Sequence, residues 1–270
     1  MSVAPPWPFR RVLAHRGGGA LAPENTIAAI KVGLERGYRA VEFDAMLAAD
    51  EIPVLMHDPT LERTGRIGGA VSELAAAELE RIDVGGWHSP RFIGETVPTL
   101  ERTLRFCRDH DIWPNIEIKP VPGFEAATGA AVASVTSQIY ADLIRPEGEH
   151  TDRFDPRIPL LSSFAPDALI AAREVAPSLP RGWLVDEVPS QWRKELTRLG
   201  CVSLHTNHRH LTAAQARDIK RAGKWLFCYT VNSPQRARTV FNWGADAFCT
   251  DALDRIPADL TPASPAAAYR

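Results

Sequence analysis

The sequence has little cysteine and no dominant charge, and each shortage argues against a class of protein. Its four cysteines are widely spaced and form no Cys-x-x-Cys pair, so we expect them to be reduced residues of the core. Lys and Arg number 31 against 33 Asp and Glu, a net charge of -2. No overall basic field therefore recommends nucleic acid or an anionic membrane as a partner, and any preference for an anion must be local.

Long apolar runs are also missing. No uninterrupted run approaches the roughly 18 residues of a membrane span, so we expect no stable membrane insertion. Residues 1–13 carry three prolines and lack the apolar core that a secretory signal requires. A cytoplasmic location is therefore the default expectation, and the sequence does not indicate an oligomeric state.

The chain is long enough for one large α/β domain. It has 270 residues, of which 45% are hydrophobic, and α/β barrels run to about 250 residues without dividing. Candidate strands alternate with candidate helices and end near His15, Asp44, Lys119, Ser163, Val185, His205, Val231 and Thr250. Eight such units predict a single domain over residues 1–270, a closed (β/α)8 TIM barrel with its active site at the carboxyl ends of the strands.

One strand candidate falls outside this alternation. Residues 52–58 form an apolar run that follows residues 40–47 after a short connection. The connection is too short for the crossover that parallel strands need, so an antiparallel hairpin is predicted. Residues 59–98 then interrupt the rhythm with glycines and prolines around one helix candidate at 72–82. We predict a small insertion that covers the site as a lid.

Chemically active side chains cluster at the predicted strand ends. His15 and Arg16 follow the first apolar run, and His57 ends the hairpin strand. Glu42 and Asp44 lie two residues apart in an apolar strand, so they project from one face. Two adjacent carboxylates repel each other unless a cation joins them. A single histidine at a strand end is usually structural, whereas two of them flanking a carboxylate strand indicate chemistry.

Glu117 and Lys119 share one face of a later strand. Taken by themselves, these two residues are most simply explained as a structural ion pair. With the preceding residues they complete a set of three carboxylates, two histidines and two cationic side chains. The carboxylates suit a hard divalent cation, the histidines can transfer protons, and the two cationic side chains can bind an anion. Together these groups describe a site for a phosphodiester. Oxygen ligands favour Mg²⁺ or Ca²⁺ over zinc and do not separate these two ions.

These residues belong to an ordered series of short motifs. In chain order the motifs are His15-Arg16-Gly17, Pro23-Glu24-Asn25-Thr26, Glu42-Phe43-Asp44, His57-Asp58, Ile116-Glu117-Ile118-Lys119, Tyr229-Thr230-Val231-Asn232 and Thr250-Asp251. Single motifs occur by chance, but an ordered set is hard to obtain that way. The set resembles the motifs of the glycerophosphodiester phosphodiesterase family over roughly residues 10 to 255, and it looks closest to the cytoplasmic bacterial enzymes.

The resemblance implies metal-dependent hydrolysis of a small glycerophosphodiester, such as glycerophosphocholine or glycerophosphoethanolamine, to sn-glycerol 3-phosphate and an alcohol. The roles it implies are a single Mg²⁺ or Ca²⁺ on Glu42, Asp44 and Glu117, proton transfer by His15 and His57, phosphate binding by Arg16 and Lys119, and a substrate contact by Asn25. Phe164 and Tyr229 follow or end predicted barrel strands, and this position makes them candidates for substrate contacts. Phe164 and Tyr229 would wall the glycerol side of the pocket, although core packing explains both nearly as well.

Other interpretations stay open at the level of sequence. The run 205–210 is rich in histidine and lies near a strand end; since no acidic partner accompanies it, a secondary substrate contact is favoured over a second metal. A phospholipase D-like activity on lysophospholipids would use the same fold, but no amphipathic basic segment supports it. A catalytically silent phosphodiester-binding protein would need the cationic clamps and would have no use for two histidines.

Overall fold

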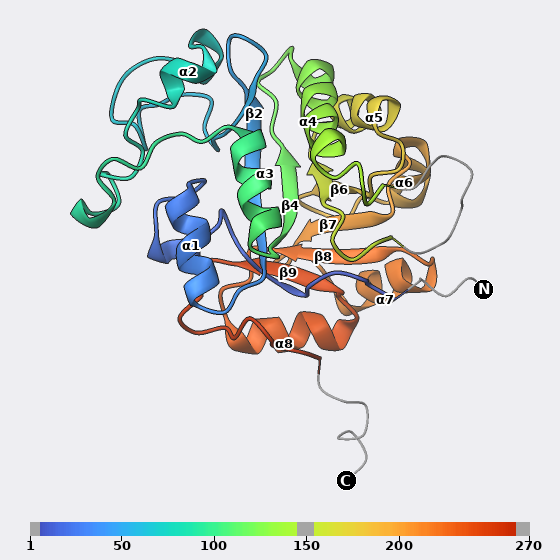
Figure 1. Ribbon diagram of the computed structural model, residues 1–270. Helices are drawn as coiled ribbons and strands as arrows, with labels where there is room; N and C mark the ends of the chain where they lie inside the picture. The colour runs from blue at the N-terminus through green and yellow to red at the C-terminus, as the bar shows by residue number, and fades with distance from the viewer. Residues whose placement is uncertain (1–5, 145–153, 263–270) are drawn as a thin grey trace.

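The computed structural model describes residues 6–144 and 154–262. Within them, eight parallel strands pair side by side and close on themselves through the β1–β2 contact, with helices outside (Figure 1). The predicted (β/α)8 TIM barrel is therefore confirmed. The barrel strands are β1 (Val12–Ala14), β2 (Ala40–Leu47), β4 (Trp113–Ile118), β5 (Leu160–Ser163), β6 (Arg181–Val185), β7 (Ser203–Asn207), β8 (Trp225–Tyr229) and β9 (Ala247–Thr250).

The predicted hairpin is also confirmed. Strand β3 (Pro53–Leu55) pairs antiparallel with the end of β2, with Ala45 opposite Leu55. It lies outside the barrel ring, because β2 already has β1 and β4 as its barrel neighbours. The hairpin carries the chain past the carboxyl end of β2 and leaves His57 beside the strand ends of the barrel.

The helices cover the barrel in the order expected from the sequence. Thr26 caps the first of them by accepting a hydrogen bond from the backbone N–H of Ala29. Pro166 and Pro234 stand in the first turn of two others, where a missing N–H costs nothing. The barrel helices are α1 (Ile27–Glu35), α3 (Leu100–Asp109), α4 (Glu125–Ile139), α5 (Pro166–Val175), α6 (Trp192–Leu199), α7 (Ala213–Arg221) and α8 (Pro234–Trp243).

An aromatic cluster closes the amino-terminal end of the barrel. Trp113 and Trp225 are the first residues of β4 and β8, and Trp7 and Phe9 pack against both of them. The Phe9 and Trp113 rings stack at 4.5 Å, and the other pairs meet edge to face. These apolar rings fill this end of the barrel interior, and the polar side chains of the strands gather at the opposite, carboxyl end.

The insertion at 59–98 is a separate lobe beside α1, visible around α2 in Figure 1. The single helix predicted at 72–82 is wrong, because the backbone is extended at Leu74 and Ala75. Two shorter helices form instead, the 3-10 helix η2 (Val71–Glu73) and the α-helix α2 (Ala76–Leu79), followed by the 3-10 helix η3 (Pro90–Phe92). Apolar residues of the lobe and of the β2–β3 hairpin form one core cluster.

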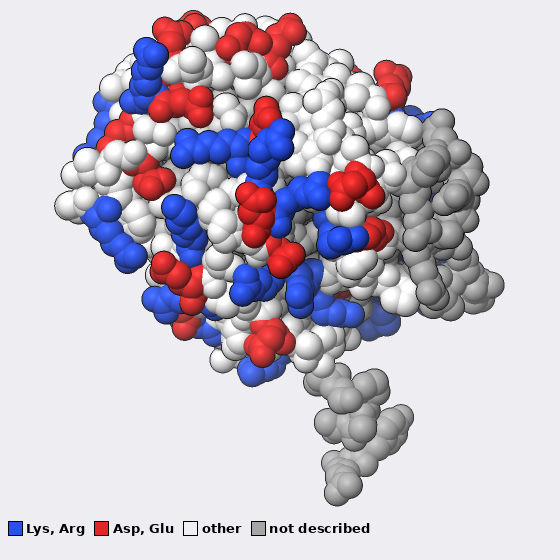
Figure 2. All heavy atoms as spheres, in the orientation of Figure 1, with Lys and Arg blue, Asp and Glu red and all other residues white. Residues whose placement is uncertain are grey.

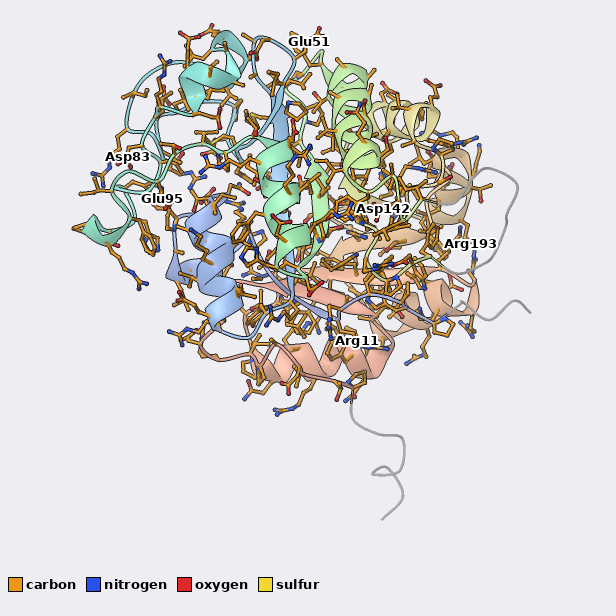
Figure 3. All side chains as sticks on the ribbon, in the orientation of Figure 1. Arg11, Glu51, Asp83, Glu95, Asp142 and Arg193 are labelled. Atoms are coloured by element: carbon orange, nitrogen blue, oxygen red, sulfur yellow. The ribbon has the colours of Figure 1, made fainter. Side chains whose placement is uncertain are left out.

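Asp83 organises the glycine-rich part of this lobe. Its carboxylate accepts hydrogen bonds from the backbone N–H groups of Gly85, Gly86 and Gly94, at 2.9, 2.7 and 2.6 Å. Glu95 then joins the lobe to the barrel by accepting a hydrogen bond from Ala28 in the first turn of α1; Figure 3 places Asp83 and Glu95 in the lobe. The side chain of an acidic residue is favoured there by the helix dipole.

Two expectations from composition concern the rest of the molecule. All four cysteines are free and buried, as predicted. Over the described ranges, no helix combines the length and apolar character that crossing a membrane requires. Basic and acidic side chains alternate on the face shown in Figure 2, without a continuous patch of one sign there.

Candidate active site

Three carboxylates converge at the carboxyl ends of β2 and β4. The strand register places Asp44 opposite Glu117, and Glu42 projects from the same face of β2 as Asp44. One carboxylate oxygen from each of the three lies within 4.8 Å of the other two. Glu42 and Asp44 are buried, and Glu117 is partly so. The structure therefore brings together the three residues predicted to hold a metal.

The electrostatics of this cluster favour a cation. Burial raises the pKa of Glu42 to about 7, against the opposing charge of His15. Burial and the charge of Asp44 raise the pKa of Glu117 to about 8. Carboxylates this close and this buried are costly to ionise together unless positive charge is added. An all-oxygen donor set that resists ionisation fits a hard divalent ion such as Mg²⁺ or Ca²⁺.

Arg16 and Lys119 supply part of that positive charge. Arg16 Nε lies 3.5 Å from Asp44 Oδ2, and Lys119 Nζ lies 3.6 Å from Asp44 Oδ1 and 3.2 Å from Glu117 Oε1. Burial alone would raise the pKa of Asp44, but the charges of Arg16 and Lys119 outweigh it and hold this pKa below its ordinary value. Both cationic side chains line the same pocket as the carboxylates, where an anion would meet them.

Asn25 is placed differently from its predicted role. Its Nδ2 donates to Asp44 Oδ2 at 2.9 Å, and its Oδ1 accepts from the Asp44 backbone N–H at 3.1 Å. It is buried and does not line the pocket, so its amide is used on a carboxylate rather than offered to a substrate. Asn25 has a φ of 58°, a conformation that Asn tolerates better than most residues. Its amide is therefore held against Asp44.

His15 reaches the cluster from the end of β1. Its Nδ1 lies 2.6 Å from Asp251 Oδ1, just past β9, and its Nε2 lies 3.7 Å from Glu42 Oε2. Asn232 donates to the second oxygen of Asp251 at 2.8 Å and so orients that carboxylate. Burial would lower the pKa of His15, but the hydrogen bond to Asp251 and the charge of Glu42 outweigh it and raise this pKa.

His57 lies in the same pocket and has a different support. Its Nδ1 is 2.6 Å from Oδ1 of the adjacent Asp58. Arg63, from the insertion, donates from Nε to Asp58 at 2.5 Å and from Nη1 and Nη2 to Glu24 at 2.7 Å each. Glu24 also accepts from Arg16 at 2.8 Å. A chain of ion pairs and hydrogen bonds therefore connects Arg16 to His57 through Arg63 of the insertion.

The surroundings lower the pKa of His57. Burial lowers it, and the nearby charges of Arg16 and Lys119 act in the same direction, while the charge of Asp44 and the hydrogen bond to Asp58 oppose them without full compensation. The two histidines of the pocket are therefore shifted in opposite directions. Neither ring uses its Nε2 in its hydrogen bond to aspartate, so this atom of each is available to a ligand.

The pocket that holds these groups has a volume of about 250 Å³ and is lined by residues from all around the barrel. Phe164 and Tyr229 lie on it, with ring centroids 5.9 Å apart and the rings at 81°. Phe164 is 46% exposed, so core packing does not explain it. Every predicted site residue except Asn25 lines this one pocket.

The histidine-rich run 205–210 corrects one expectation. Acidic residues do accompany it: His210 Nδ1 lies 3.1 Å from Asp186 and 3.8 Å from Glu187, on the preceding strand loop. These three side chains are exposed and lie outside the pocket. His205 in contrast is buried and lines the pocket, and it is unrelated to this cluster.

Sequence reasoning missed several supporting residues. Asp251, Asn232 and Glu24 stand in motifs that were noted, but nothing local indicated their partners. Asp251 is 236 residues away from the histidine it supports. Arg63 lies in the insertion, which the sequence predicts to be a lid.

Comparisons with known proteins agree with this geometry. A family model described as "Glycerophosphoryl diester phosphodiesterase family" matches residues 15–255. A glycerophosphodiester phosphodiesterase from Caldanaerobacter subterraneus is 31% identical over 245 residues, covering 89% of this chain and 93% of that protein. One from Bacillus subtilis is 25% identical over 255 residues, covering 90% of this chain and 83% of its own.

A solved structure is similar over nearly the whole chain. It is that of an Oleispira antarctica phosphodiesterase in complex with the product sn-glycerol-3-phosphate. The two chains are 34% identical and superimpose with a TM-score of 0.81, covering 93% of this chain and 94% of the other. Sequence and structure thus point to the same set of relatives.

Proposed function

Because the chain belongs to the glycerophosphoryl diester phosphodiesterase family, we propose that it hydrolyses glycerophosphodiesters such as glycerophosphocholine or glycerophosphoethanolamine to sn-glycerol 3-phosphate and an alcohol. The observation that carries this proposal is the meeting of Glu42, Asp44 and Glu117 within 4.8 Å in the pocket that also holds His15 and His57. A relative that binds sn-glycerol-3-phosphate supports the choice of product.

Glu42, Asp44 and Glu117 would hold one divalent cation, Mg²⁺ or Ca²⁺. When bound, such an ion supplies positive charge that stabilises the negative charge developing on a nonbridging phosphate oxygen. The raised pKa values of Glu42 and Glu117, about 7 and about 8, support this assignment. A bound cation would offset the burial and the carboxylate repulsion that raise them. Asn25 would fix Asp44 for the same purpose by holding both its backbone and its carboxylate.

Arg16 and Lys119 would bind the remaining phosphate oxygens. Arg16 already aligns two of its nitrogens on carboxylates, so its guanidinium is held in one orientation before substrate arrives. Charge-assisted hydrogen bonds from both residues to the phosphate would strengthen as negative charge builds in the transition state. Phe164 and Tyr229 would provide an apolar wall for the carbon atoms of the glycerol.

His15 and His57 would move the protons. An aspartate carboxylate accepts from Nδ1 of each ring, and this leaves each Nε2 to face the substrate. One histidine takes a proton from the nucleophile, and the other gives a proton to the leaving alkoxide. General acid–base groups of this kind contribute roughly 10² to 10⁴ each in rate.

The test is release of sn-glycerol 3-phosphate from glycerophosphocholine by purified protein. We expect turnover that EDTA abolishes and that added Mg²⁺ or Ca²⁺ restores, and we expect Glu42→Ala to be inactive while it remains folded. Turnover that EDTA leaves unchanged would contradict the metal assignment. Faster cleavage of micellar lysophosphatidylcholine would favour the phospholipase D-like alternative, and tight binding without turnover in saturating metal would favour a binding protein.

Some expectations from sequence stay predictions. They are the single domain over all of residues 1–270, movement of residues 59–98 as a lid, and a cytoplasmic location. The structure gives the insertion one relevant property: through Arg63 it contacts Glu24 and Asp58 directly. A lid that opened would therefore have to break these ion pairs.

A further inference from the structure

A second pocket lies between the barrel and the insertion, beside the catalytic one. It has a volume of about 440 Å³, and its walls include Trp87 and His88 of the insertion and Asp251 after β9. Over the part of the chain that the structure describes, His15 and Arg16 line both pockets and no other residue does so. This second pocket, the lobe pocket, therefore adjoins the groups that would act on the phosphate.

The insertion contacts the barrel directly at the lobe pocket. His88 Nε2 lies 3.2 Å from the carbonyl oxygen of Ala20, in the segment that follows β1. Because a carbonyl oxygen only accepts hydrogen bonds, Nε2 carries a proton, and Nδ1 of the neutral ring is an acceptor. Among the described residues, this Nδ1 is buried without a hydrogen-bond partner. The lobe pocket thus has a wall that is held in place and an acceptor that the protein itself does not use.

Asp251 supplies negative charge and further acceptors. It accepts hydrogen bonds from His15 Nδ1 at 2.6 Å and from Asn232 Nδ2 at 2.8 Å, one on each carboxylate oxygen. A carboxylate has about four acceptor positions, so roughly half of those of Asp251 remain. Burial would raise the pKa of Asp251, but the hydrogen bond and the charge of His15 outweigh it and lower this pKa. The side chain is 35% exposed, so an ionised carboxylate is accessible from the lobe pocket.

Trp87 supplies an aromatic surface of fixed orientation. Its Nε1 donates to the carbonyl oxygen of Val84 at 2.9 Å, so its polar atom is already engaged. The guanidinium of Arg63 lies 5.8 Å from the centroid of the ring, which places this indole against a cation. The face of an indole attracts positive charge more strongly than the other aromatic rings do. Apart from His15 and Arg16, the lobe pocket therefore offers a ligand acceptors, negative charge and an aromatic surface.

Acceptors, negative charge and an aromatic surface together select a ligand that is positively charged and donates hydrogen bonds. We propose that the lobe pocket binds the leaving alcohol of the substrate when that alcohol carries an ammonium group, as ethanolamine does. The ammonium group lies against Trp87 and donates to Asp251, with Nδ1 of His88 as the second acceptor. The inference rests on the proposed function and names the class of headgroup that the enzyme prefers.

The two ends of the substrate would then lie in different pockets. Phe164 and Tyr229, assigned to the glycerol carbons, line the catalytic pocket alone. Arg16, which lines both, is already paired with Glu24 at 2.8 Å and with Asp44 at 3.5 Å, so its charge is largely offset. A neutral headgroup would leave the negative charge and the unused acceptor of the lobe pocket without a partner, so it should bind more weakly.

The test compares two phosphate monoesters as ligands of the Mg²⁺-loaded enzyme by calorimetry, phosphoethanolamine and propyl phosphate. They have the same chain length and differ in one terminal group, ammonium in the first and methyl in the second. Neither is a diester, so binding is measured without turnover. We expect phosphoethanolamine to bind roughly 10-fold more tightly, and Trp87→Ala and His88→Leu each to bring the two affinities closer together. Equal affinities in the wild type, or a preference that Trp87→Ala leaves unchanged, would overturn the proposal.

Ile93→Ala is the matched control. Ile93 is a large apolar residue of the same lobe, 69% exposed, and it does not line the lobe pocket. This variant should keep the wild-type ratio of affinities. Trp87→Phe keeps an aromatic ring and should retain part of the preference. Binding of propyl phosphate also reports that each variant is folded.

Kinetics separate the lobe pocket from the other contact of Trp87, the guanidinium of Arg63. Loosening of Arg63 would lower kcat equally for glycerophosphoethanolamine and for glycerophosphoglycerol, whose leaving alcohol is neutral. Loss of the lobe pocket would raise KM for glycerophosphoethanolamine alone. We expect Trp87→Ala to raise this KM roughly 10-fold relative to that for glycerophosphoglycerol. An equal change for both substrates would contradict the proposal.

The same measurements distinguish this inference from the proposed function. Wild-type enzyme that prefers phosphoethanolamine through Trp87 but cleaves no glycerophosphodiester would support the lobe pocket and contradict the proposed activity. Wild-type enzyme that cleaves glycerophosphoethanolamine but binds the two monoesters equally would do the reverse.

Discussion

The two histidine–aspartate pairs of the pocket have the same local geometry and different foundations. In each pair Nδ1 lies 2.6 Å from a carboxylate oxygen. The His15–Asp251 pair is built by β1 and β9, neighbouring strands of the barrel. The His57–Asp58 pair is adjacent in sequence, and Arg63 of the insertion holds it in place. One pair thus depends on the barrel and the other on the lobe beside it.

This difference affects the electrostatics as well as the mechanics. His15 is the more buried ring, yet Asp251 and Glu42 raise its pKa. His57 is the more exposed, yet burial and nearby cations lower its pKa. Two histidines with the same hydrogen bond to an aspartate can therefore have pKa values shifted in opposite directions, because charges beyond that aspartate decide the direction.

The largest expected effect comes from removing either histidine. We predict that His15→Ala and His57→Ala each lower kcat for glycerophosphocholine by roughly 10² to 10⁴. Since both are proposed to act in one reaction, the double variant should lose little more than the worse single variant. Single-turnover release of sn-glycerol 3-phosphate measures this. Near wild-type turnover in either single variant would remove that histidine from the mechanism.

The next effect separates the two aspartates. We predict that Asp251→Asn and Asp58→Asn each lower kcat by about 10- to 100-fold, as is typical of groups that orient a functional side chain. The loss should be greater for Asp251, because water can replace the partner of the more exposed His57 more easily. Steady-state kinetics on the two variants decide the order. A greater loss for Asp58→Asn would show that the barrel pair is the less important one.

A smaller effect is expected from the insertion. Hydrogen bonds from Arg63 lower the pKa of Asp58 to about 2, so Arg63→Ala should loosen His57 and lower kcat by roughly 10-fold. Arg91→Ala is the control, because Arg91 is exposed in the same lobe and contacts only the ring of Phe92 among the interactions described. If both variants retain full activity, the lobe does not support His57.

The smallest effect concerns the stability of the lobe. Hydrogen bonds from the backbone N–H groups of Gly86, Gly94 and Gly85 lower the pKa of Asp83. We predict that Asp83→Ala reduces the free energy of unfolding by about 1 kcal/mol at neutral pH and changes kcat little. Glu62→Ala, at another exposed acid of the lobe, should have less effect.

The pH dependence of this effect follows from the direction of the shift. A carboxyl whose pKa is lowered by folding stabilises the protein above its unfolded pKa, near 4 for aspartate, and loses this contribution as pH falls through the folded value. The difference between wild type and Asp83→Ala should therefore shrink below about pH 4. Urea unfolding at several pH values measures it. A difference that grows on acidification would contradict the assignment.

Most of the fold could be predicted from the sequence because barrel strands and helices alternate with clear local signals. The short connection after β2 allowed only a hairpin, and the structure has one. The single helix at 72–82 is wrong because its apolar spacing comes from two shorter helices that pack on the hairpin. Spacing alone does not distinguish one helix from two shorter ones when neighbouring elements supply the packing.

The pocket-lining residues could be predicted because strands alternate with a period of two and end at one face. The residues behind them could not. Asp251 and Arg63 meet their histidine and aspartate partners only through the closed barrel and the folded lobe. Asn25 was expected at the substrate, but its backbone turn aims its amide at Asp44 instead. Orientation of a side chain in a loop depends on tertiary contacts, which a local pattern does not contain.

The most direct test of the central claim is a crystal structure with Mg²⁺ and sn-glycerol 3-phosphate. The account predicts one ion bound by Glu42, Asp44 and Glu117, with the phosphate on that ion and between His15 and His57. An ion bound instead at the exposed cluster of residues 186, 187 and 210, or a phosphate out of reach of either histidine, would contradict it.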